Sequence, residues 1–238
     1  MDLPQTIKAT LLRRYKRFLA DIELPDQPGK AITVHCPNPG AMTGLALPGA
    51  QVYLTKPQSK TAKLPYAWWI TDLGGQEGMV GINANLPNKL VAEALKQRLL
   101  PGFEHYIFDR AEVVVRPGTR LDFQMLLAGE KVFMEVKNVH LVREPGLAEF
   151  PDCKTERGTK HLHVLMEMAQ AGMKCVMLYC IQRGDCTELS FAKDIDPNYA
   201  EAAQKASKAG VRFVAVDCVV TTRAITIARE IPVIGLDR

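Results

Sequence analysis

The sequence lacks the patterns that mark several protein classes. None of the six cysteines forms a Cys-x-x-Cys pair, and the five histidines have no zinc-type spacing, so a structural zinc site is not indicated. There is no apolar run of about 18 residues, as a membrane span requires, and no basic segment at the start that would suggest a leader for export. We therefore expect a soluble cytoplasmic protein whose cysteines are reduced thiols.

A strong charge of one sign is also missing. The 30 Lys and Arg residues against 26 Asp and Glu residues give a net charge of +4, which permits nucleic-acid binding without arguing for it. No helix-turn-helix or zinc finger is recognisable, so any DNA binding should depend on phosphate contacts and tolerate different sequences. Nothing in the sequence indicates a protein partner or an oligomeric state.

The chain does contain a predicted β-hairpin with acidic residues. Two strand-like runs, 121–127 and 131–137, flank the dipeptide Ala128-Gly129. If residue 127 faces residue 130 across this loop, Asp122 faces Glu135, with Cβ atoms about 5 Å apart. Two carboxylates at that separation repel each other unless a cation lies between them. Lys137 shares a strand face with Glu135, because side chains alternate along a strand.

An Asp, a Glu and a Lys at this spacing suit metal-dependent cleavage of a phosphodiester. Mg²⁺ prefers oxygen ligands, usually takes one or two carboxylates and keeps several waters. We predict Asp122 and Glu135 as catalytic metal ligands for Mg²⁺ or Mn²⁺, with the Val136 carbonyl as a third ligand. Lys137 would then orient the attacking water or balance developing charge. The simpler alternative is an exposed hairpin face with an ordinary ion pair.

Two basic clusters are candidate DNA contacts. The N-terminal basic cluster combines cations, which bind the phosphates of nucleic acid, with an aromatic ring, on which a base can stack. The alternative is a solvated basic face. In the second basic cluster, spacings of three and four place the side chains on one face of a predicted helix over 156–171. There, a Glu156–Lys160 ion pair and an ordinary partly buried histidine are the alternatives. The N-terminal basic cluster is Arg13, Arg14, Tyr15, Lys16 and Arg17, and the second basic cluster is Arg157, Lys160 and His161.

The distribution of strand and helix patterns predicts two domains, an α/β protein with a β domain in front. The first domain, 1–83, should form a five-stranded OB-like barrel, a fold that binds single strands. The second domain, 84–238, alternates helices and apolar strands, as a mixed sheet covered by helices does. The strands of the first domain are expected at 6–24, 31–36, 50–55, 66–73 and 79–83. The elements of the second are expected as a helix capped by Asn88, strands at 111–115, 121–127 and 131–137, a helix at 156–171, a strand at 174–181, a helix at 199–209 and strands at 211–220 and 224–228.

An Asp followed after a dozen residues by Glu-Val-Lys resembles the active-site signature of the PD-(D/E)XK nuclease superfamily. The core of that superfamily runs helix, three strands, helix, strand, and the predicted order of the second domain matches it. The resemblance also implies a further acidic residue on the first helix that supports the metal, which here would be Glu93. An exposed Glu93 beside Gln97, four residues on, is the alternative.

Short runs along most of the chain are similar to the sugar fermentation stimulation protein family, SfsA. That resemblance implies a cytoplasmic bacterial or archaeal protein with an N-terminal OB-like domain and a nuclease-like C-terminal domain. Pro39 and Cys153 depart from the family pattern, and neither belongs to the acidic cluster. The runs are Arg-Tyr-Lys-Arg-Phe-Leu-Ala-Asp at 14–21, His-Cys-Pro-Asn-Pro-Gly-Ala-Met at 35–42, Leu-Pro-Asn at 86–88, Arg-Leu-Asp-Phe at 120–123, Glu-Val-Lys-Asn at 135–138, Phe-Pro-Asp at 150–152 and Thr-Glu-Arg-Gly-Thr-Lys-His-Leu at 155–162.

Three functions remain open at this point. The first is a metal-dependent nuclease, and the second is a catalytically silent DNA-binding regulator of carbohydrate metabolism, the role that the family resemblance implies. The third is a sugar enzyme that uses Asp122 and Glu135 as an acid and base pair. It fits less well, because a separation of about 5 Å suits only a retaining glycosidase and leaves Lys137 without a role.

Overall fold

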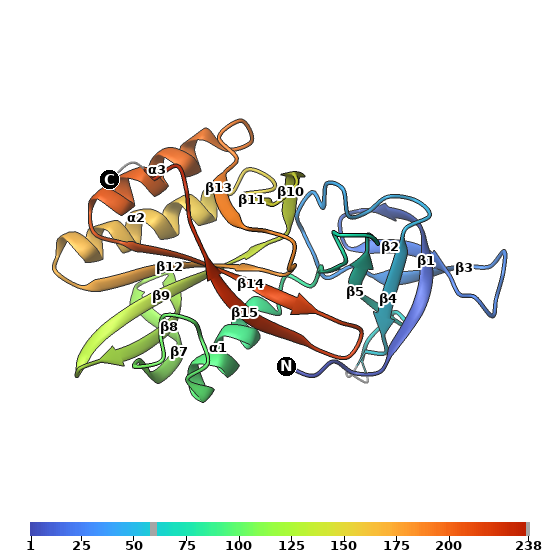
Figure 1. Cartoon of the computed structure of the whole chain (residues 1–238), viewed down its shortest axis with the longest axis horizontal. Coiled ribbons are helices and arrows are strands. Elements are labelled where there is room, and N and C mark those ends of the chain that lie inside the picture. The colour runs from blue at the N-terminus through green and yellow to red at the C-terminus, as the bar shows by residue number, and fades with distance from the viewer. Residues whose placement is uncertain (58–60, 237–238) are drawn as a thin grey trace.

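The computed structural model describes residues 1–57 and 61–236. It has two parts, a strand-rich N-terminal part and a C-terminal part in which helices cover a sheet (Figure 1). The expected fold class, an OB-like β domain followed by a mixed-sheet α/β domain, is confirmed. No helix in the described ranges is long and apolar enough to cross a membrane.

The N-terminal part is a sheet that closes on itself. Its strands follow the order β3-β2-β1-β4-β5-β6, and a further pairing of His35 with Ala67 joins β3 to β5. The opening segment, expected as one element, consists of two strands joined by a turn at Lys16 and Arg17, which both have positive φ. This turn accounts for the strand beyond the expected five. The strands are β1 (Thr6–Tyr15), β2 (Leu19–Glu23), β3 (Ala31–His35), β4 (Gln51–Thr55), β5 (Ala67–Asp72) and β6 (Met79–Gly81).

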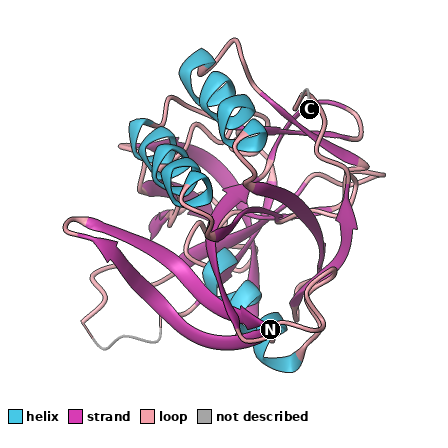
Figure 2. Ribbon diagram, turned by 90° about the vertical axis from the view of Figure 1, so that its left-hand side faces the viewer, coloured by secondary structure: helices cyan, strands magenta, loops and turns pink. Residues whose placement is uncertain are grey.

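The C-terminal part is built on a six-stranded sheet of order β15-β14-β12-β9-β8-β7. Apolar residues of α2 and α3 pack on one face of this sheet and those of α1 pack on the other (Figure 2). Strand β12 is buried along nearly its whole length and is parallel to both neighbours, β9 and β14, as expected for a central strand. The elements are α1 (Pro87–Gln97), β7 (Ile107–Arg116), β8 (Thr119–Leu127), β9 (Glu130–Val139), α2 (Glu156–Gln170), β12 (Lys174–Ile181), α3 (Pro197–Lys208), β14 (Arg212–Val220) and β15 (Ile225–Ile231).

A small third sheet was not expected from the sequence. It consists of β10 (Leu141–Glu144), β11 (Leu147–Phe150) and β13 (Glu188–Phe191), and β11 pairs in parallel with β13. Each strand has only four residues, and β10 and β11 combine apolar and charged side chains. Periodicity over so short a segment does not separate a strand from a loop.

The β8–β9 hairpin has the predicted register. Ala128 and Gly129 have φ values of 51° and 84°, the left-handed geometry that a two-residue hairpin loop favours. Pairing runs from Leu127 opposite Glu130 to Phe123 opposite Met134. Asp122 precedes Phe123 in the chain and so lies just beyond this last pair. Leu121 packs in the core on the α2 side and Phe123 in the core on the α1 side, so β8 changes face at Asp122.

Hydrogen bonds and a close approach of the main chain join the two parts of the molecule. The Gly81 N–H donates to the Gln182 carbonyl at 2.8 Å. Asp152 packs against Gly40. A Cβ atom added to residue 40 would lie only 2.1 Å from Asp152 Oδ2, so this position accepts only glycine. The same Oδ2 lies 3.3 Å from His140 Nε2. The domain boundary near residue 83 stays a prediction.

Candidate metal centre and its basic surroundings

Glu135 is the centre of a buried polar cluster formed by β9 and α2. Only 3% of its surface is exposed. Its Oε1 atom accepts a hydrogen bond from Lys137 Nζ at 2.6 Å and also contacts His161 Nδ1. Its Oε2 atom is buried and has no hydrogen-bond partner among the described residues. Buried carboxylate oxygens are almost always hydrogen-bonded in proteins, so this atom is free to accept a further bond.

Asp122 is held beside this cluster by two donors. Asn88 Nδ2 donates to its Oδ1 atom at 2.6 Å, and the Val136 N–H donates to its Oδ2 atom at 2.7 Å. The Val136 N–H is available because the β8–β9 pairing ends at Met134, two residues before it. The N–H and C=O of a strand residue point to the same side of the strand. The Val136 carbonyl therefore points toward the same edge of β9 as Asp122 does.

The two carboxyl groups differ in their affinity for protons. Burial, followed by the charge of Glu135, raises the pKa of Asp122 from 3.8 to about 6. Burial also acts to raise the pKa of Glu135, but the contact with His161 and the charge of Lys137 outweigh it and lower that pKa. Glu135 is thus the stable anion of the pair, and Asp122 carries the cost of the second charge. A cation between them would remove that cost.

Glu93 is not part of this site, which corrects the prediction made for it. Its carboxylate pairs with the N-terminal amine of Met1 at 3.0 Å, and its side chain is 40% exposed. Asn88 is the α1 residue that reaches Asp122. Residues on a helix are about 100° apart, so Asn88 and Glu93 point to different sides of α1. Within the described ranges, no three His, Cys, Asp or Glu side chains gather as a metal site.

Asn88 also differs from its predicted role as a helix cap. Helix α1 begins at Pro87 with Leu86 as the N-cap, and no side chain caps it. The amide of Asn88 is therefore free to bind Asp122. No local pattern indicates this contact, because the two residues are 34 positions apart in the chain.

The second basic cluster lies together, as predicted, at the start of α2. Arg157, Lys160 and His161 line one cavity of about 350 Å³. His161 also contacts Glu135, so this cavity adjoins the acidic pair. The remaining lining residues come from the β7–β8 hairpin and were not predicted: Val114, Gly118, Thr119 and Arg120.

Most side chains of the N-terminal basic cluster form hydrogen bonds within their own domain. Arg13 Nε donates to Asp21 at 2.8 Å, and its guanidinium lies over the Tyr15 ring at 5.0 Å. The Tyr15 hydroxyl donates to the same carboxylate at 3.0 Å. Arg14 donates to main-chain carbonyls of the 38–41 loop. Arg14 and Tyr15 therefore have structural contacts that the sequence did not indicate.

Lys16 and Arg17 are different, because their side chains are exposed at the β1–β2 turn. Neither forms an ion pair within the described part of the chain. Of the five residues of the N-terminal basic cluster, these two are the ones left free to meet a ligand.

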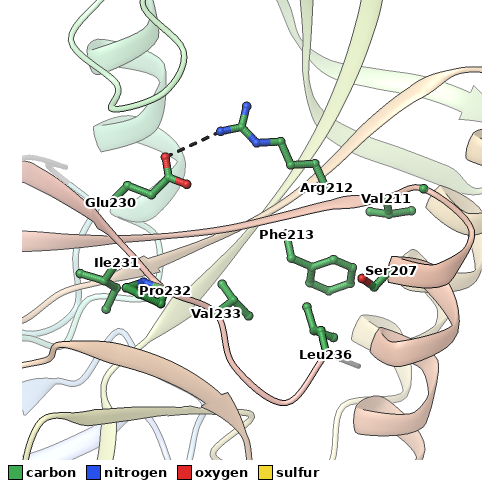
Figure 3. A pocket seen from close by; sticks show the side chains of 10 residues that line it. Ser207, Val211, Arg212, Phe213, Glu230, Ile231, Pro232, Val233 and Leu236 are labelled. Atoms are coloured by element: carbon green, nitrogen blue, oxygen red, sulfur yellow. Dashed lines mark ion pairs between the residues drawn. The ribbon is translucent and has the colours of Figure 1, made fainter. Parts of the chain in front are cut away.

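A larger cavity, about 790 Å³, lies between the end of α3 and strands β14 and β15 (Figure 3). Phe213, Val233 and Leu236 provide its apolar lining. Its cation, Arg212, pairs with Glu230 at 3.7 Å. In the sheet, β14 and β8 lie on opposite sides of β12 and β9, so this cavity is separate from Asp122 and Glu135.

Comparison with known proteins relates this geometry to a family. Residues 12–82 match the family described as the SfsA N-terminal OB domain, and residues 85–224 match the sugar fermentation stimulation protein RE domain. The chain belongs to the SfsA family. Both expected domains of that family are thus present, and the acidic pair lies in the RE domain.

Relatives and a solved structure agree with this assignment. A sugar fermentation stimulation protein homolog from Azorhizobium caulinodans is 44% identical over 234 residues, which cover 96% of this chain and 97% of the relative. The homolog from Agrobacterium fabrum is 43% identical, with 94% and 93% covered. The protein in the structure of Pyrococcus furiosus SfsA in complex with Ca²⁺ is 24% identical in sequence, and the match covers 98% of this chain and 97% of the Pyrococcus furiosus chain. Its TM-score of 0.85 shows that the two share the fold.

Proposed function

We propose that this SfsA family member binds DNA with little sequence preference and holds Mg²⁺ or Mn²⁺ at a nuclease-type site. The observation that carries the proposal is the Glu135 Oε2 atom, which is buried without a partner beside Asp122. A divalent cation would bind that oxygen and allow both carboxylates to be ionised.

The donors around this position suit a hard cation. Two carboxylates and the Val136 carbonyl are oxygen ligands, and Mg²⁺ typically combines one or two carboxylates with water. The relative from Pyrococcus furiosus is described as a complex with Ca²⁺, another cation that prefers oxygen. Within the described ranges no third acidic side chain joins the pair, as expected for an ion that keeps several waters.

Each residue of the site has a separate task. A bound divalent ion would lower the pKa of its water and polarise a phosphoryl oxygen. Lys137, 2.6 Å from Glu135, balances charge that develops on the phosphate in the transition state. His161 and Asn88 hold Glu135 and Asp122 in place from α2 and α1, as residues behind metal ligands commonly do.

DNA binding is assigned to the cations with few protein partners. Arg157 and Lys160 lie beside the acidic pair, and Lys16 and Arg17 lie at the β1–β2 turn. These side chains provide phosphate contacts, which position a strand without reading its bases.

A catalytically silent DNA-binding regulator of carbohydrate metabolism is the second candidate. It is favoured by the double contact at Glu135 Oε1, where Lys137 and His161 already compensate one charge without any metal. In that case the cluster would be a buried ion pair that supports the fold.

Calorimetric titration with Mn²⁺ separates these candidates. The parent protein should bind one equivalent, and the double variant Asp122→Asn, Glu135→Gln should not. Glu93→Gln is the matched control, because it removes a carboxylate of the same domain outside the site, and it should bind as the parent does. Equal binding by the parent and the double variant would place the metal elsewhere and remove the basis of the proposal.

Turnover is then assayed with labelled single-stranded, duplex and branched DNA in Mg²⁺ or Mn²⁺. Cleavage that depends on Asp122 would support the nuclease. Binding of DNA and metal without cleavage of any form would favour the silent regulator.

A further inference from the structure

The cavity at the start of α2 has features that its proposed DNA contacts do not explain. It lies between the tip of the β7–β8 hairpin and the first two turns of the helix, and we call it the α2 cavity. An ion pair of 2.6 Å between Arg116 and Glu167 fastens the hairpin tip to α2. The cavity is therefore lined by two elements that are joined to each other, rather than by a single exposed helix end.

The α2 cavity has more positive charge than the protein balances. Arg157 and Lys160 form no ion pair or hydrogen bond with any described residue. Arg120 shares its charge with Glu112 at 3.3 Å. Two uncompensated cations thus line a cavity of about 350 Å³, which is large enough for a phosphate group and part of a sugar.

A buried hydroxyl in the cavity also lacks a hydrogen-bond partner among the described residues. Thr119 is only 4% exposed, and its hydroxyl has no hydrogen-bond partner among the described residues. His161 is 5% exposed; its Nδ1 atom contacts Glu135, while its Nε2 atom forms no hydrogen bond with any described residue. A buried hydroxyl without a partner costs free energy, and a ligand with oxygen acceptors would supply the missing bond.

We propose that the α2 cavity binds a phosphate group at the end of a nucleic-acid strand. A terminal phosphate carries a charge of roughly −1.5 to −2 at neutral pH, which matches the two uncompensated cations. A phosphodiester within a strand carries only one negative charge. Arg157 and Lys160 contact the phosphate oxygens, and the Thr119 hydroxyl donates to one of them.

This assignment rests on the proposed function for the identity of the strand, and it specifies the substrate class. Because His161 touches both the cavity and Glu135, a strand end held in the cavity lies beside the acidic pair. The site would then act on strands with phosphorylated ends in preference to continuous ones.

The test measures binding without metal, so that it does not depend on turnover. Short single strands of one sequence are prepared with a 5′-phosphate, with a 3′-phosphate, or with hydroxyl groups at both ends. Their affinities for the full-length protein are measured by fluorescence anisotropy in EDTA. One phosphorylated end should bind about tenfold more tightly than the hydroxyl end, the size of one hydrogen bond to a charged group. Equal affinities for all three strands would overturn the proposal.

Variants locate the effect. Arg157→Ala and Lys160→Ala should each remove most of the preference for the phosphorylated end. Lys208→Ala is the matched control: it removes one exposed cation at the far end of α3. Asp196, the N-cap of α3, accepts the N–H of Thr155, so the two helices start together and Lys208 lies roughly 18 Å away along α3. A loss of preference in Lys208→Ala equal to that in Arg157→Ala would overturn the assignment to the cavity.

Thr119→Val provides a variant that does not alter charge. It keeps the shape of the side chain and removes a hydroxyl that has no hydrogen-bond partner among the described residues, so the melting temperature should not fall. The preference for the phosphorylated end should drop about three- to tenfold. An unchanged preference in this folded variant would remove the hydroxyl from the site.

The outcome is separable from that of the metal experiment. Strands bound without regard to their ends, in a protein that binds Mn²⁺ at Asp122 and Glu135, would refute only the phosphate site. A clear preference for phosphorylated ends in a protein that binds no Mn²⁺ would refute only the metal site.

Discussion

The two basic clusters contain the same kinds of side chain but differ in what those side chains contact. Arg13 and Arg14 of the N-terminal basic cluster donate to a carboxylate and to loop carbonyls inside their own domain. Arg157 and Lys160 of the second basic cluster have no partner among the described residues and line a cavity. A cluster of cations is therefore a candidate binding site only where the fold leaves its donors free.

The local geometry of each cluster explains the difference. Arg13 lies opposite Asp21 in the β1–β2 pairing, so an acidic partner is part of the sheet register. On α2, Arg157 has Lys160 and His161 as its neighbours three and four residues on, and neither is acidic. Lys160 has Glu156 four residues before it, yet the structure contains no ion pair between them.

The largest expected effect tests whether the acidic pair beside the second basic cluster is a working site. Lys137→Met should reduce single-turnover DNA cleavage by about a hundredfold or more, as expected when one charge-stabilising group is lost. Mn²⁺ affinity should be retained, because Lys137 acts in the transition state and is not a metal ligand. The measurements are cleavage, metal titration and melting temperature for parent and variant. A large fall in melting temperature without a specific loss of cleavage would make Lys137 part of a structural ion pair.

The next effect concerns stability and should separate the two clusters directly. Arg14→Ala removes the donors to the 38–41 loop and should lower the free energy of unfolding by about 2 to 3 kcal/mol. Arg157→Ala removes no hydrogen bond or ion pair with a described residue and should change it by less than about 0.5 kcal/mol. Urea denaturation measures both. If the two variants were equally stable, the contrast between the clusters would not hold.

The loop that Arg14 holds should also respond to acid. The pKa of Asp152 lies at about 2, below its usual 3.8, because the contact with His140 and the hydrogen bonds from Cys153 and Met42 outweigh the effect of burial. Its folded pKa is lowered, so the stabilisation is complete above pH 4 and is lost as the pH falls from about 4 to 2.

The contribution of Asp152 is about 2 kcal/mol, since each pKa unit corresponds to 1.36 kcal/mol. Asp152→Asn should therefore be less stable than the parent at pH 6, and the two should converge near pH 2. Urea denaturation as a function of pH measures this difference. A constant difference across that range would show that the Asp152 charge does not hold the loop.

The smallest effect is on the salt dependence of DNA binding. Arg157→Ala should lower the slope of log affinity against log salt by about one unit, the amount for one lost phosphate contact. Arg13→Ala should leave the slope nearly unchanged, because its guanidinium is paired with Asp21. Lys16→Ala and Arg17→Ala should lie between these two. A larger change for Arg13 than for Arg157 would reverse the comparison.

Features that depend on neighbouring residues in the chain could be predicted. The Ala128-Gly129 loop set the hairpin register. The helix predicted from residue 199 is α3, and the adjacent Asp196-Pro197 is a typical helix start: the Asp196 carboxylate accepts the Tyr199 N–H. Strand β12 has the predicted limits, because a continuous apolar run distinguishes a buried strand from its surroundings.

Features that depend on distant residues could not be predicted. Glu93 was expected near the acidic pair because it lies on the first helix, but the rotation of α1 directs Asn88 there instead. The use of Arg14 within the protein depends on a loop 24 or more residues away. The hydroxyl of Thr119 is notable only because it is buried without a hydrogen-bond partner among the described residues.

One carboxylate fixes the starting points of both helices on this face of the sheet. Asp196 is 5% exposed; its Oδ1 atom accepts the Tyr199 N–H of α3, and its Oδ2 atom accepts the N–H of Thr155, the N-cap of α2. The first turn of α2 is therefore ordered during folding, before any ligand arrives. Because this backbone is already ordered, binding does not have to overcome the entropy cost of ordering it. Each contact that Arg157 and Lys160 make therefore contributes more to the affinity.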